Sequence, residues 1–406
     1  MNVCVFSRQV FWQGVKGGME IHGKLLSEGL VNKGCSVTTI STRHPEGVKH
    51  EVRKGVNFHY LENTIFGSRR NGWAKESVKK FLHLNKVKPF DVVWSQSFDA
   101  FGLTKNKKDA LDIPIIPVLQ GCIHQEIVTF LVRASMAHKR PIKTLKALAG
   151  LFFSYFAIQR KLLSCADVVI TPSYQVPRDI ERWFGSKTRS KCLTVFNGID
   201  TELFKPNHQY RRAIRQRYGI DENTILLLSA GRLIKEKGHH ITIDVLSRLK
   251  LHSDQIKLMI VGDGENLDDF KSRVKKYCLE EDVIFTGFIE NTETVKYFNC
   301  CDIFLMPTLR EEGLPFVLIE TMACQKPSVV SKIGGNISVI DDNRNGILVD
   351  PGSIDAMVKK VLFLINNDIF AGELARCARQ TVIKKFSVEK MVNQTFEVFK
   401  DYKKKQ

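Results

Sequence analysis

Two glutamates in the second half of the chain have a spacing that suits a sugar bound next to a phosphate. Glu312 and Glu320 bracket the seven residues Gly313-Leu314-Pro315-Phe316-Val317-Leu318-Ile319, shortly after a predicted strand over 303–306. Proline is typical of the first turn of a helix, and the free amides at a helix start bind phosphate. The two carboxylates would accept hydrogen bonds from sugar hydroxyl groups. A general-acid pair is the competing role.

Two cations follow the first predicted strand of the same half. Arg232 comes directly after Gly231, and Lys237 follows five residues later, next to Gly238. Arginine gives planar, bidentate contacts to phosphate, and lysine gives a point charge. The pair predicts a clamp for a diphosphate. A solvated charged loop is the alternative, which the run Lys235-Glu236-Lys237 favours when it is taken alone.

Three glycine pairs come after predicted strands. Gly17-Gly18 predicts a turn into the first helix, whose N-terminal amides would be available to an anion; a plain tight turn is the alternative. Gly334-Gly335 would offer amides in the same way, whereas Gly262-Asp263-Gly264 is a weak signal by itself. Residues 18–24 match most of a phosphate-binding P-loop, but Leu25 stands where that loop needs Ser or Thr to hold magnesium. A P-loop NTPase is therefore excluded.

The residues that usually bind metals are not spaced as a metal site. His239 and His240 are adjacent, so their side chains point apart. The chain has no Asp-x-Asp pair to hold a metal–diphosphate complex, and its ten cysteines include no Cys-x-x-Cys pair. We therefore expect a site that works without a metal. We also expect reduced thiols, as in a cytosolic protein, and no disulfide framework.

Strand-like and helix-like segments alternate along the chain, which predicts an α/β protein with parallel sheets covered by helices on both faces. Strands are expected in the first half at 3–6, 36–40, 91–94, 115–118, 168–170 and 195–198, and in the second half at 224–229, 257–261, 283–286, 303–306, 328–331 and 347–349. Helices are expected at 19–33, 265–278, 353–365 and 387–404.

This alternation predicts two domains of similar size, with a boundary near residue 206. The domains are expected at 1–205 and 206–386, and the tail helix within 387–406 must pack on one of them. Ligands bind at the carboxyl ends of the strands in open α/β sheets. Two such sheets that face each other across a cleft favour an enzyme that closes around its ligand.

The net charge is uneven. The chain has 406 residues, is 43% hydrophobic and carries a net charge of +18, so a disordered protein is excluded. Residues 1–205 hold 31 basic and 16 acidic side chains, whereas residues 206–406 hold 30 and 27. The basic half predicts an anionic partner, such as nucleic acid, a phospholipid surface or a phosphorylated acceptor. No run reaches the roughly 20 apolar residues of a membrane span. The first six residues lack a basic region before their apolar stretch, so we expect a buried strand there and not a signal peptide.

One segment of the basic half suits an anionic membrane surface. The uncharged run 147–158 contains Phe152, Phe153, Tyr155 and Phe156, and basic residues flank it on both sides. A cationic stretch with an aromatic face is typical of contact with a bilayer surface. A core helix with solvated charges beside it is the alternative, and it is the one that charge patterning by itself favours.

Taken together, these motifs resemble those of the retaining glycosyltransferases of family 4, and the resemblance covers nearly the whole chain. That family has the GT-B architecture of two Rossmann-like domains, so the resemblance implies this fold. The matching segments, in order, are Gly17-Gly18-Met19-Glu20, Thr171-Pro172-Ser173, Asn197-Gly198-Ile199-Asp200, Phe204-Lys205-Pro206, Gly231-Arg232-Leu233, Lys237-Gly238, Val261-Gly262-Asp263-Gly264, Phe285-Thr286-Gly287, Glu312 to Glu320 and Asn345-Gly346-Ile347-Leu348-Val349.

The resemblance implies that the second domain holds a nucleotide-sugar donor. Arg232 and Lys237 would grip its diphosphate, Glu320 would bind the ribose hydroxyls, and Glu312 would contact the donor sugar; Arg232, Lys237 and Glu312 would be the catalytic residues. The base would lie near 286–289. The other donor-binding positions would be Gly262, Thr286, Phe288, Gly313, Leu314, Pro315 and Phe316. The first domain would hold the acceptor, and the tail helix would pack on it.

Two departures from the family pattern affect the site. Relatives often carry His-Gly or His-Asp after the strand that matches 115–118, whereas this chain has Gln120-Gly121, with His124 further on. Gln120 or His124 would contact the transferred sugar, on the same side as Gly17 and Gly18. Relatives also often have Gly-Gly-x-x-Glu where this chain has Ser338 as the last residue, which changes the pocket or reflects another local hydrogen bond.

The resemblance implies transfer of a hexose-type sugar from a UDP- or GDP-linked donor to a hydroxyl of a lipid-linked or polysaccharide acceptor in cell-envelope glycan assembly, without a further cofactor. We expect a cytoplasmic protein at the inner face of the membrane. A sugar-nucleotide epimerase or phosphorylase with the same two-domain plan is the rival enzyme. A basic nucleic-acid-binding protein would need aromatic residues interleaved with basic ones or a recognition helix, and neither is seen.

Overall fold

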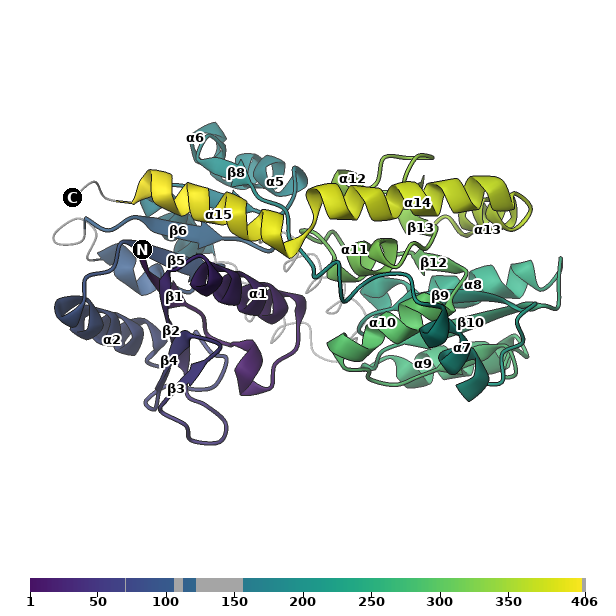
Figure 1. Ribbon diagram of the computed structural model, residues 1–406, viewed down its shortest axis with the longest axis horizontal. Helices are drawn as coiled ribbons and strands as arrows, with labels where there is room; N and C mark the ends of the chain where they lie inside the picture. The colour runs from purple at the N-terminus through teal and green to yellow at the C-terminus, as the bar shows by residue number, and fades with distance from the viewer. Residues whose placement is uncertain (70, 106–111, 122–155, 404–406) are drawn as a thin grey trace, which may run out of the picture. The chain divides into compact units, whose positions relative to one another are not determined.

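The structure, a computed structural model, describes residues 1–69, 71–105, 112–121 and 156–403. The chain forms two compact units (Figure 1). The N-terminal unit comprises Met1–Gly198 together with Val388–Gln406, and the C-terminal unit comprises Ile199–Ser387. The chain therefore passes from one unit to the other at residue 199, a few residues before the predicted boundary near 206, because Ile199 pairs with Ser387 in a short β-bridge of the C-terminal unit.

The N-terminal unit is built on an eight-stranded sheet with the order β3-β4-β2-β1-β5-β6-β7-β8. All neighbouring strands are parallel except β3 and β4. Its elements are β1 (Asn2–Phe6), η1 (Phe11–Gln13), α1 (Gly18–Asn32), β2 (Ser36–Thr42), β3 (His50–Arg53), β4 (Val56–Leu61), α2 (Trp73–Val87), β5 (Val92–Gln96), η2 (Phe101–Lys105), β6 (Ile115–Val118), β7 (Val169–Thr171), α5 (Gln175–Phe184), α6 (Ser186–Arg189), β8 (Cys192–Thr194) and α15 (Val388–Tyr402).

Strand β1 shows why this sheet is covered on both faces. Side chains alternate across a strand, and both sets of β1 are apolar and buried. Val3 and Val5 belong to a core on the side of α1 and α15, whereas Cys4 and Phe6 belong to a core on the side of α2 and α5. A strand that is buried on both faces reads as a continuous apolar run, which is why the sequence shows it clearly.

The tail helix α15 is part of the N-terminal unit. Its apolar residues Met391, Val392 and Phe399 are buried in the core beneath α1. A side chain at Gly29 of α1 would place its Cβ 2.2 Å from Cγ2 of Val392. The two helices therefore approach each other closely because one of them carries glycine at the contact.

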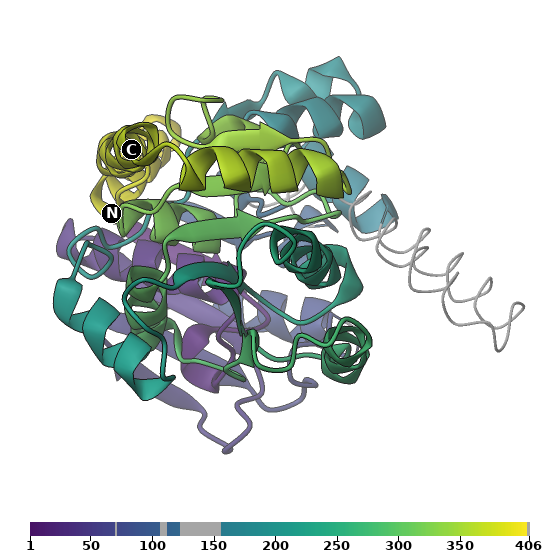
Figure 2. The ribbon, with the colours of Figure 1, turned by 90° about the vertical axis from the view of Figure 1, so that its right-hand side faces the viewer.

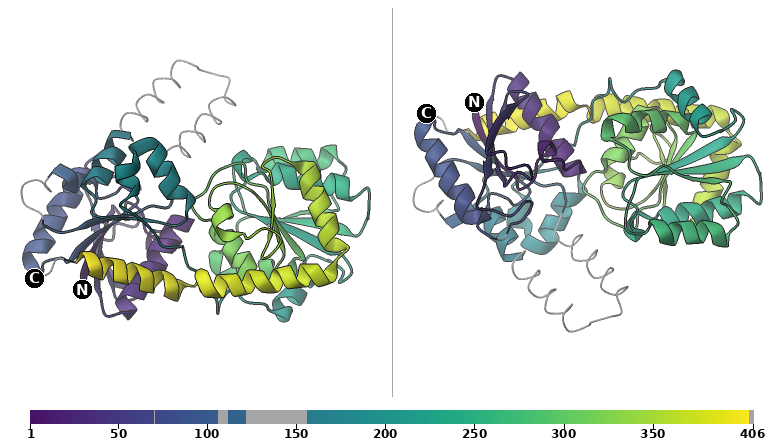
Figure 3. Two further views of the ribbon diagram at one scale, coloured as in Figure 1. Left: turned by 90° about the horizontal axis from the view of Figure 1, so that it is seen from above. Right: turned by 90° about the horizontal axis from the view of Figure 1, so that it is seen from below.

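The C-terminal unit is built on a six-stranded, fully parallel sheet with the order β11-β10-β9-β12-β13-β14. Helices cover both faces (Figure 2, Figure 3). Its elements are α7 (His208–Arg217), β9 (Ile225–Ala230), η3 (Lys235–Lys237), α8 (His239–Leu249), β10 (Ile256–Val261), α9 (Leu267–Lys276), β11 (Val283–Phe285), α10 (Asn291–Cys300), β12 (Ile303–Met306), α11 (Phe316–Ala323), β13 (Ser328–Ser331), α12 (Asn336–Val339), β14 (Ile347–Val349), α13 (Ile354–Ile365) and α14 (Asp368–Lys385).

Several local predictions need correction. The strand expected at 195–198 lies three residues earlier, as the edge strand β8, because 192–194 pair with β7. The polar stretch before β9 forms the helix α7, which Asn207 caps by accepting hydrogen bonds from the amides of Gln209 and Tyr210. Pro315 is the N-cap of α11 and lies just outside its first turn. In the parts of the chain that the structure describes, no helix is long and apolar enough to cross a bilayer.

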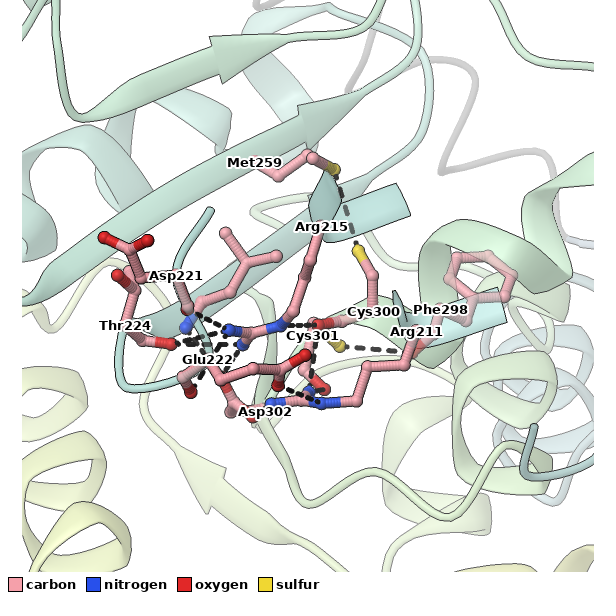
Figure 4. A network of polar contacts seen from close by, with 11 residues as sticks. Arg211, Arg215, Asp221, Glu222, Thr224, Met259, Phe298, Cys300, Cys301 and Asp302 are labelled. Carbon is pink, nitrogen blue, oxygen red and sulfur yellow. Dashed lines mark hydrogen bonds and ion pairs between the residues drawn. The ribbon is translucent and has the colours of Figure 1, made fainter. Parts of the chain in front are cut away.

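An arginine network ties together the amino ends of β9 and β12 (Figure 4). The guanidinium of Arg215, which is 1% exposed, donates to the carbonyl oxygens of Cys300, Asp221 and Thr224. It also pairs with Asp302 at 2.6 Å. The same carboxylate accepts the amide of Leu226 at 2.7 Å. The network lies at the amino ends of strands whose carboxyl ends carry the predicted site residues.

Replacement of Arg215 by methionine keeps the apolar stem and removes every one of these donors. We expect Arg215→Met to lower the free energy of unfolding by about 3 kcal/mol, the lower end for a broken buried ion pair, because Arg211 still pairs with Asp302. Urea denaturation measures the effect. Arg212→Met, an exposed residue of the same helix, is the matched control. A loss below about 1 kcal/mol, the scale of a surface ion pair, would contradict a buried anchoring role.

Candidate functional site

The turn after β9 carries Arg232, and the turn after β10 supports it from behind. Gly231 has φ of 140°, and Gly262 approaches it so closely that a Cβ at Gly262 would lie 2.0 Å from the carbonyl oxygen of Gly231. The amide of Leu233 donates to the carbonyl of Asp263 at 2.9 Å. Gly262 therefore positions the Arg232 turn, and any side chain there would push the turn out of place.

Arg232 itself is exposed. Within the described residues, its guanidinium has no hydrogen bond or ion pair to another side chain. An exposed, planar guanidinium at the carboxyl end of a strand can bind two oxygens of a phosphate group in a bidentate manner.

Lys237 and Glu312 form an ion pair that joins two turns of the C-terminal unit. The ammonium of Lys237 lies 2.5 Å from Oε1 of Glu312, and the two side chains are 22% and 19% exposed. Lys237 ends the short helix η3 after β9, and Glu312 lies in the segment between β12 and α11. Because β9 and β12 are neighbours in the sheet, the predicted cation and the predicted carboxylate meet beyond the carboxyl ends of these two strands.

The backbone holds the two turns in this position. A Cβ at Gly238, which has φ of 78°, would lie 2.0 Å from the carbonyl oxygen of Pro307. The carbonyl of Glu236 accepts the amide of Leu309 at 2.9 Å and the hydroxyl of Thr308 at 3.2 Å. The chain after β9 and the chain after β12 are thus packed backbone against backbone, directly beside the ion pair.

Gly334 and Gly335 support the Glu312 segment from the other side. The amide of Gly335 donates to the carbonyl of Glu312 at 2.7 Å. A Cβ at Gly335 would lie 2.0 Å from the carbonyl oxygen of Gly313. These contacts go to the backbone of residues 312 and 313, so this glycine pair positions the glutamate. Ser338, three residues after Gly335, lies in the short helix α12, and its amide donates to the carbonyl of Gly335 at 2.9 Å.

Helix α11 begins without a capping side chain. Its N-cap is Pro315 with ψ of 122°, and no side chain of the described residues accepts from the first-turn amides. Gly313, Leu314 and Pro315 are buried, and Phe316 is half-buried. Uncapped amides at a helix N-terminus form a site for an anion. The amides of the first turn of α11 can therefore serve a phosphate group next to Glu312.

Glu320 lies in α11 and is only 4% exposed. Its Oε1 accepts a hydrogen bond from the side-chain amide of Asn291 at 3.1 Å. Burial raises the pKa of Glu320 to about 7, and the amide of Asn291 lowers it in part. A carboxylate with this pKa changes its charge near neutral pH, which perturbed groups at functional sites often do.

The segment expected to receive the base follows β11. The hydroxyl of Thr286 donates to the carbonyl of Gly287 at 3.0 Å, and Gly287 has φ of 72°. Phe288 is 61% exposed. The amide of Gly262 donates to the carbonyl of Gly287 at 3.0 Å. The base segment and the Arg232 turn are therefore linked through Gly262.

His239, the first of the two adjacent histidines, is a buried and neutral side chain. His239 is 1% exposed, and its Nδ1 lies 3.0 Å from the hydroxyl of Ser229. Burial lowers the pKa of His239 to about 3, so the ring is neutral.

Across residues 1–69, 71–105, 112–121 and 156–403, no group of three or more His, Cys, Asp or Glu side chains is placed to hold a metal ion.

The N-terminal unit carries the remaining predicted residues. Gly17 is the N-cap of α1 and Gly18 its first residue. The carboxylate of Glu20, which is 7% exposed, lies over this helix start, where a Cβ at Gly17 would be 2.5 Å from its Oε2. Burial raises the pKa of Glu20, and the nearby backbone amides lower it in part. A side chain of the protein itself thus meets amides that the sequence predicts to be open to an anion.

Gln120 follows β6. Its Oε1 accepts a hydrogen bond from the side-chain amide of Asn197 at 2.8 Å, and its Nε2 is buried without a hydrogen-bond partner in the described part of the chain. Asn197 comes from the segment after β8, which is separated from β6 by β7 in the sheet, so the amide of Gln120 is oriented by the chain that follows another strand. His124 and most of the run 147–158 lie outside the described residues.

Family models match the two parts of the chain separately. Residues 16–203 match the model described as Glycosyltransferase Family 4, and residues 210–381 match the model described as Glycosyl transferases group 1. An uncharacterized glycosyltransferase of Methanocaldococcus jannaschii is 27% identical over 395 residues, which is 95% of both chains.

A relative with a named activity matches over a shorter stretch. A GDP-mannose-dependent alpha-(1-6)-phosphatidylinositol monomannoside mannosyltransferase of Mycolicibacterium smegmatis is 29% identical over 208 residues, 50% of this chain and 54% of the relative. The chain thus matches about half the length of this relative.

The fold is also found among solved structures. HepE from Anabaena, crystallised in complex with UDP-glucose, superposes with a TM-score of 0.75 over 99% of this chain and all of that chain, at 18% identity. Two parallel-sheet domains with this likeness are the GT-B fold. With both family models matched in order along one chain, the protein belongs to the group 1 glycosyltransferases and is a transferase enzyme of the GT-B class.

Proposed function

We propose that the protein transfers a hexose-type sugar, with retention of configuration, from a UDP- or GDP-linked donor to a hydroxyl group of an acceptor. The observation that carries this proposal is the Lys237–Glu312 ion pair beside the uncapped start of α11. A nucleotide-sugar presents a diphosphate next to a sugar. A cation next to a carboxylate, with free amides nearby, complements both groups.

The main role of this site would be to stabilise the negative charge that develops on the departing nucleoside diphosphate. In the proposed step the bond between the anomeric carbon and the phosphate oxygen breaks. The acceptor oxygen bonds to the same face of that carbon, and its proton passes to the leaving phosphate oxygen. Arg232, Lys237 and the first-turn amides of α11 would stabilise the leaving group, and groups fixed in position before the reaction are the most effective for this.

The carboxylates would recognise the neutral parts of the donor. Glu312 would accept hydrogen bonds from the transferred sugar while it holds Lys237 in place. Glu320 would accept hydrogen bonds from the ribose, and the segment around Thr286 and Phe288 would receive the base. The donor needs no separate cofactor in this scheme, and we propose that the reaction proceeds without an obligatory metal.

We propose a lipid-linked or polysaccharide acceptor that the N-terminal unit binds at the inner face of a membrane. The excess of basic over acidic side chains in residues 1–205 supports an anionic acceptor or membrane surface. The relative from Mycolicibacterium smegmatis is named for transfer to a phosphatidylinositol monomannoside. Gln120, oriented by Asn197, is the described residue of this unit that we assign to the transferred sugar.

Loss of Lys237 tests the proposed function directly. Lys237→Ala and Arg232→Ala should each lower turnover of a nucleotide-sugar on the order of 10²- to 10³-fold, because each removes one group that stabilises the leaving diphosphate. Product formation with a radiolabelled donor measures the effect, and circular dichroism checks the fold. Lys235→Ala, a neighbouring lysine in the same short helix, is the control. Full turnover by a folded Lys237→Ala protein would contradict the proposal.

Gly335 supports the backbone of Glu312, so a side chain at position 335 should lower activity. Gly335→Ala forces a Cβ against the carbonyl of Gly313, so the Glu312 segment must shift. A displacement of about 1 Å in a site of this kind costs on the order of 10²-fold in rate. Steady-state kinetics measure the loss. Gly372→Ala, where a Cβ would meet no atom within 4 Å, should keep full activity; equal activity of both variants would show that the glycine pair does not position Glu312.

The pKa of Glu320 predicts how donor affinity depends on pH. Ribose hydroxyls donate to the ionised carboxylate, which in the free protein forms as the pH rises through about 7. The dissociation constant of a nucleotide-sugar should therefore fall about tenfold between pH 6 and pH 8. Calorimetric titration measures it, since the diphosphate diester of the donor has no group that titrates in this range. Glu320→Gln should bind more weakly and without this pH dependence; a pH-dependent Gln variant would assign the effect to another group.

A further inference from the structure

The first residue of α10 contacts the carboxylate that is assigned to the ribose. Asn291 donates a hydrogen bond from its side-chain amide to Oε1 of Glu320 at 3.1 Å. We propose that Asn291 is a positioning residue for the donor nucleotide, which orients the Glu320 carboxylate so that its second oxygen meets the ribose hydroxyls. This inference rests on the proposed role of Glu320 as the ribose-binding residue.

The contact joins two helices that are separately anchored. Helix α10 is held by the buried side chains of Val295, Tyr297 and Phe298, and α11 by those of Leu318 and Ile319. Neither helix can shift at this point without disturbing the core, so the distance between the amide and the carboxylate is set by packing. A polar group held in this way costs little further ordering when the ligand arrives.

Asn291 also lies at the end of the segment assigned to the base. Phe288 precedes it by three residues, and the chain passes from the exposed ring of Phe288 directly into α10. The same short stretch would therefore carry the base contact and the group that orients the ribose contact. A change at Asn291 should weaken recognition of the nucleoside and leave the chemistry at the anomeric carbon unaffected.

The chemistry of an amide suits this task. An amide NH₂ donates without a charge, so the carboxylate keeps its negative charge for the ribose hydroxyls. A lysine or arginine partner would form a stronger pair with Glu320, and it would compete with the hydroxyls for both oxygens. Among the described residues Asn291 is the hydrogen-bond partner found for Glu320, which leaves Oε2 to accept from the ligand.

The other groups near Glu320 stay the same when Asn291 is changed. The Cys324 thiol at the end of α11 interacts with the carboxylate, and burial raises the pKa of that thiol. Arg379 from α14 directs its guanidinium to the carbonyl oxygens of Ala323 and Phe204, at 2.6 and 3.2 Å, and Lys326 lies beyond Cys324. Since none of these groups depends on Asn291, a shift in the pH dependence of binding can be assigned to the amide.

The test compares Asn291→Ala, Asn291→Asp and Thr292→Ala in the full chain. Asn291→Ala should raise the KM for the nucleotide-sugar roughly tenfold, the loss expected for one hydrogen bond to a charged group, and leave kcat nearly unchanged. The midpoint of the pH dependence of donor binding should move upward, because the ionised form of Glu320 loses its donor. Asn291→Asp should move it further, because two neighbouring carboxyl groups disfavour ionisation. Thr292, exposed in the same helix turn, should be neutral.

A double variant separates positioning from a merely structural role. In a Glu320→Gln background, Asn291→Ala should cause no further loss of donor affinity if the two residues act together. An equal loss in both backgrounds, or a weaker binding of Asn291→Ala with an unchanged pH midpoint, would overturn the inference. If the unaltered protein binds neither UDP- nor GDP-sugars, the proposed function itself fails. If it binds one of them and Asn291→Ala behaves as the unaltered protein does, only the role of Asn291 fails.

Discussion

The ion pair between Lys237 and Glu312 is the constraint on which the C-terminal unit's site depends. It connects the turn after β9 to the segment before α11 at 2.5 Å, and both side chains are about four-fifths buried. A pair of this kind contributes little to stability by itself. Its value here is geometric, because it holds a cation and a carboxylate side by side before a ligand arrives. In the proposed function, a diphosphate binds the ammonium and a sugar hydroxyl donates to the carboxylate while the two side chains stay paired.

Close backbone contacts make this arrangement rigid. Gly238 lies against Pro307, Gly262 against Gly231, and Gly335 against Gly313, each with a carbonyl oxygen 2.0 Å from the place of an added Cβ. The segment after β9, which carries Arg232 and Lys237, and the segment after β12, which carries Glu312, therefore support each other through the main chain. The glycines after β10 and β13 support them further. Groups held in this way need not reorganise as charge develops, which is the basis of electrostatic catalysis. The glycines lie behind the charged residues, and the charged residues face the ligand in the mechanism that we propose.

The sequence predicted most of the C-terminal sheet and the ends of its strands. The strands at 303–306, 328–331 and 347–349 have the predicted bounds, because each is a short apolar run between clear turn residues. The prediction for the edge strand β8 is wrong by three residues. Leu193 is 42% exposed, and an edge strand lacks the continuous apolar run of a central strand. The helix α7 was missed because its face is largely charged, although Asn207 is a recognisable cap.

Site residues could be predicted where a short sequence pattern marks them. Contacts between residues far apart in the sequence could not. Lys237 and Glu312 could be named from glycine, charge and helix signals, and their ion pair follows from adjacent strands. The contact of Asn291 with Glu320 joins residues 29 positions apart, and no local pattern marks it. The sequence predicts that the glycine pair at 334–335 offers amides to an anion, whereas the close contacts of this pair are with the backbone of Glu312 and Gly313. Such pairings arise from the packing of turns, which a single sequence does not encode in its spacing.

The most direct test of the account is a thermal-unfolding titration of the full chain with UDP- and GDP-linked sugars. We predict that one nucleotide class stabilises the protein by about 2.7 kcal/mol at 100 times its dissociation constant. If neither class stabilises the protein at millimolar concentration, the proposal that the Lys237–Glu312 ion pair binds a nucleotide-sugar is contradicted.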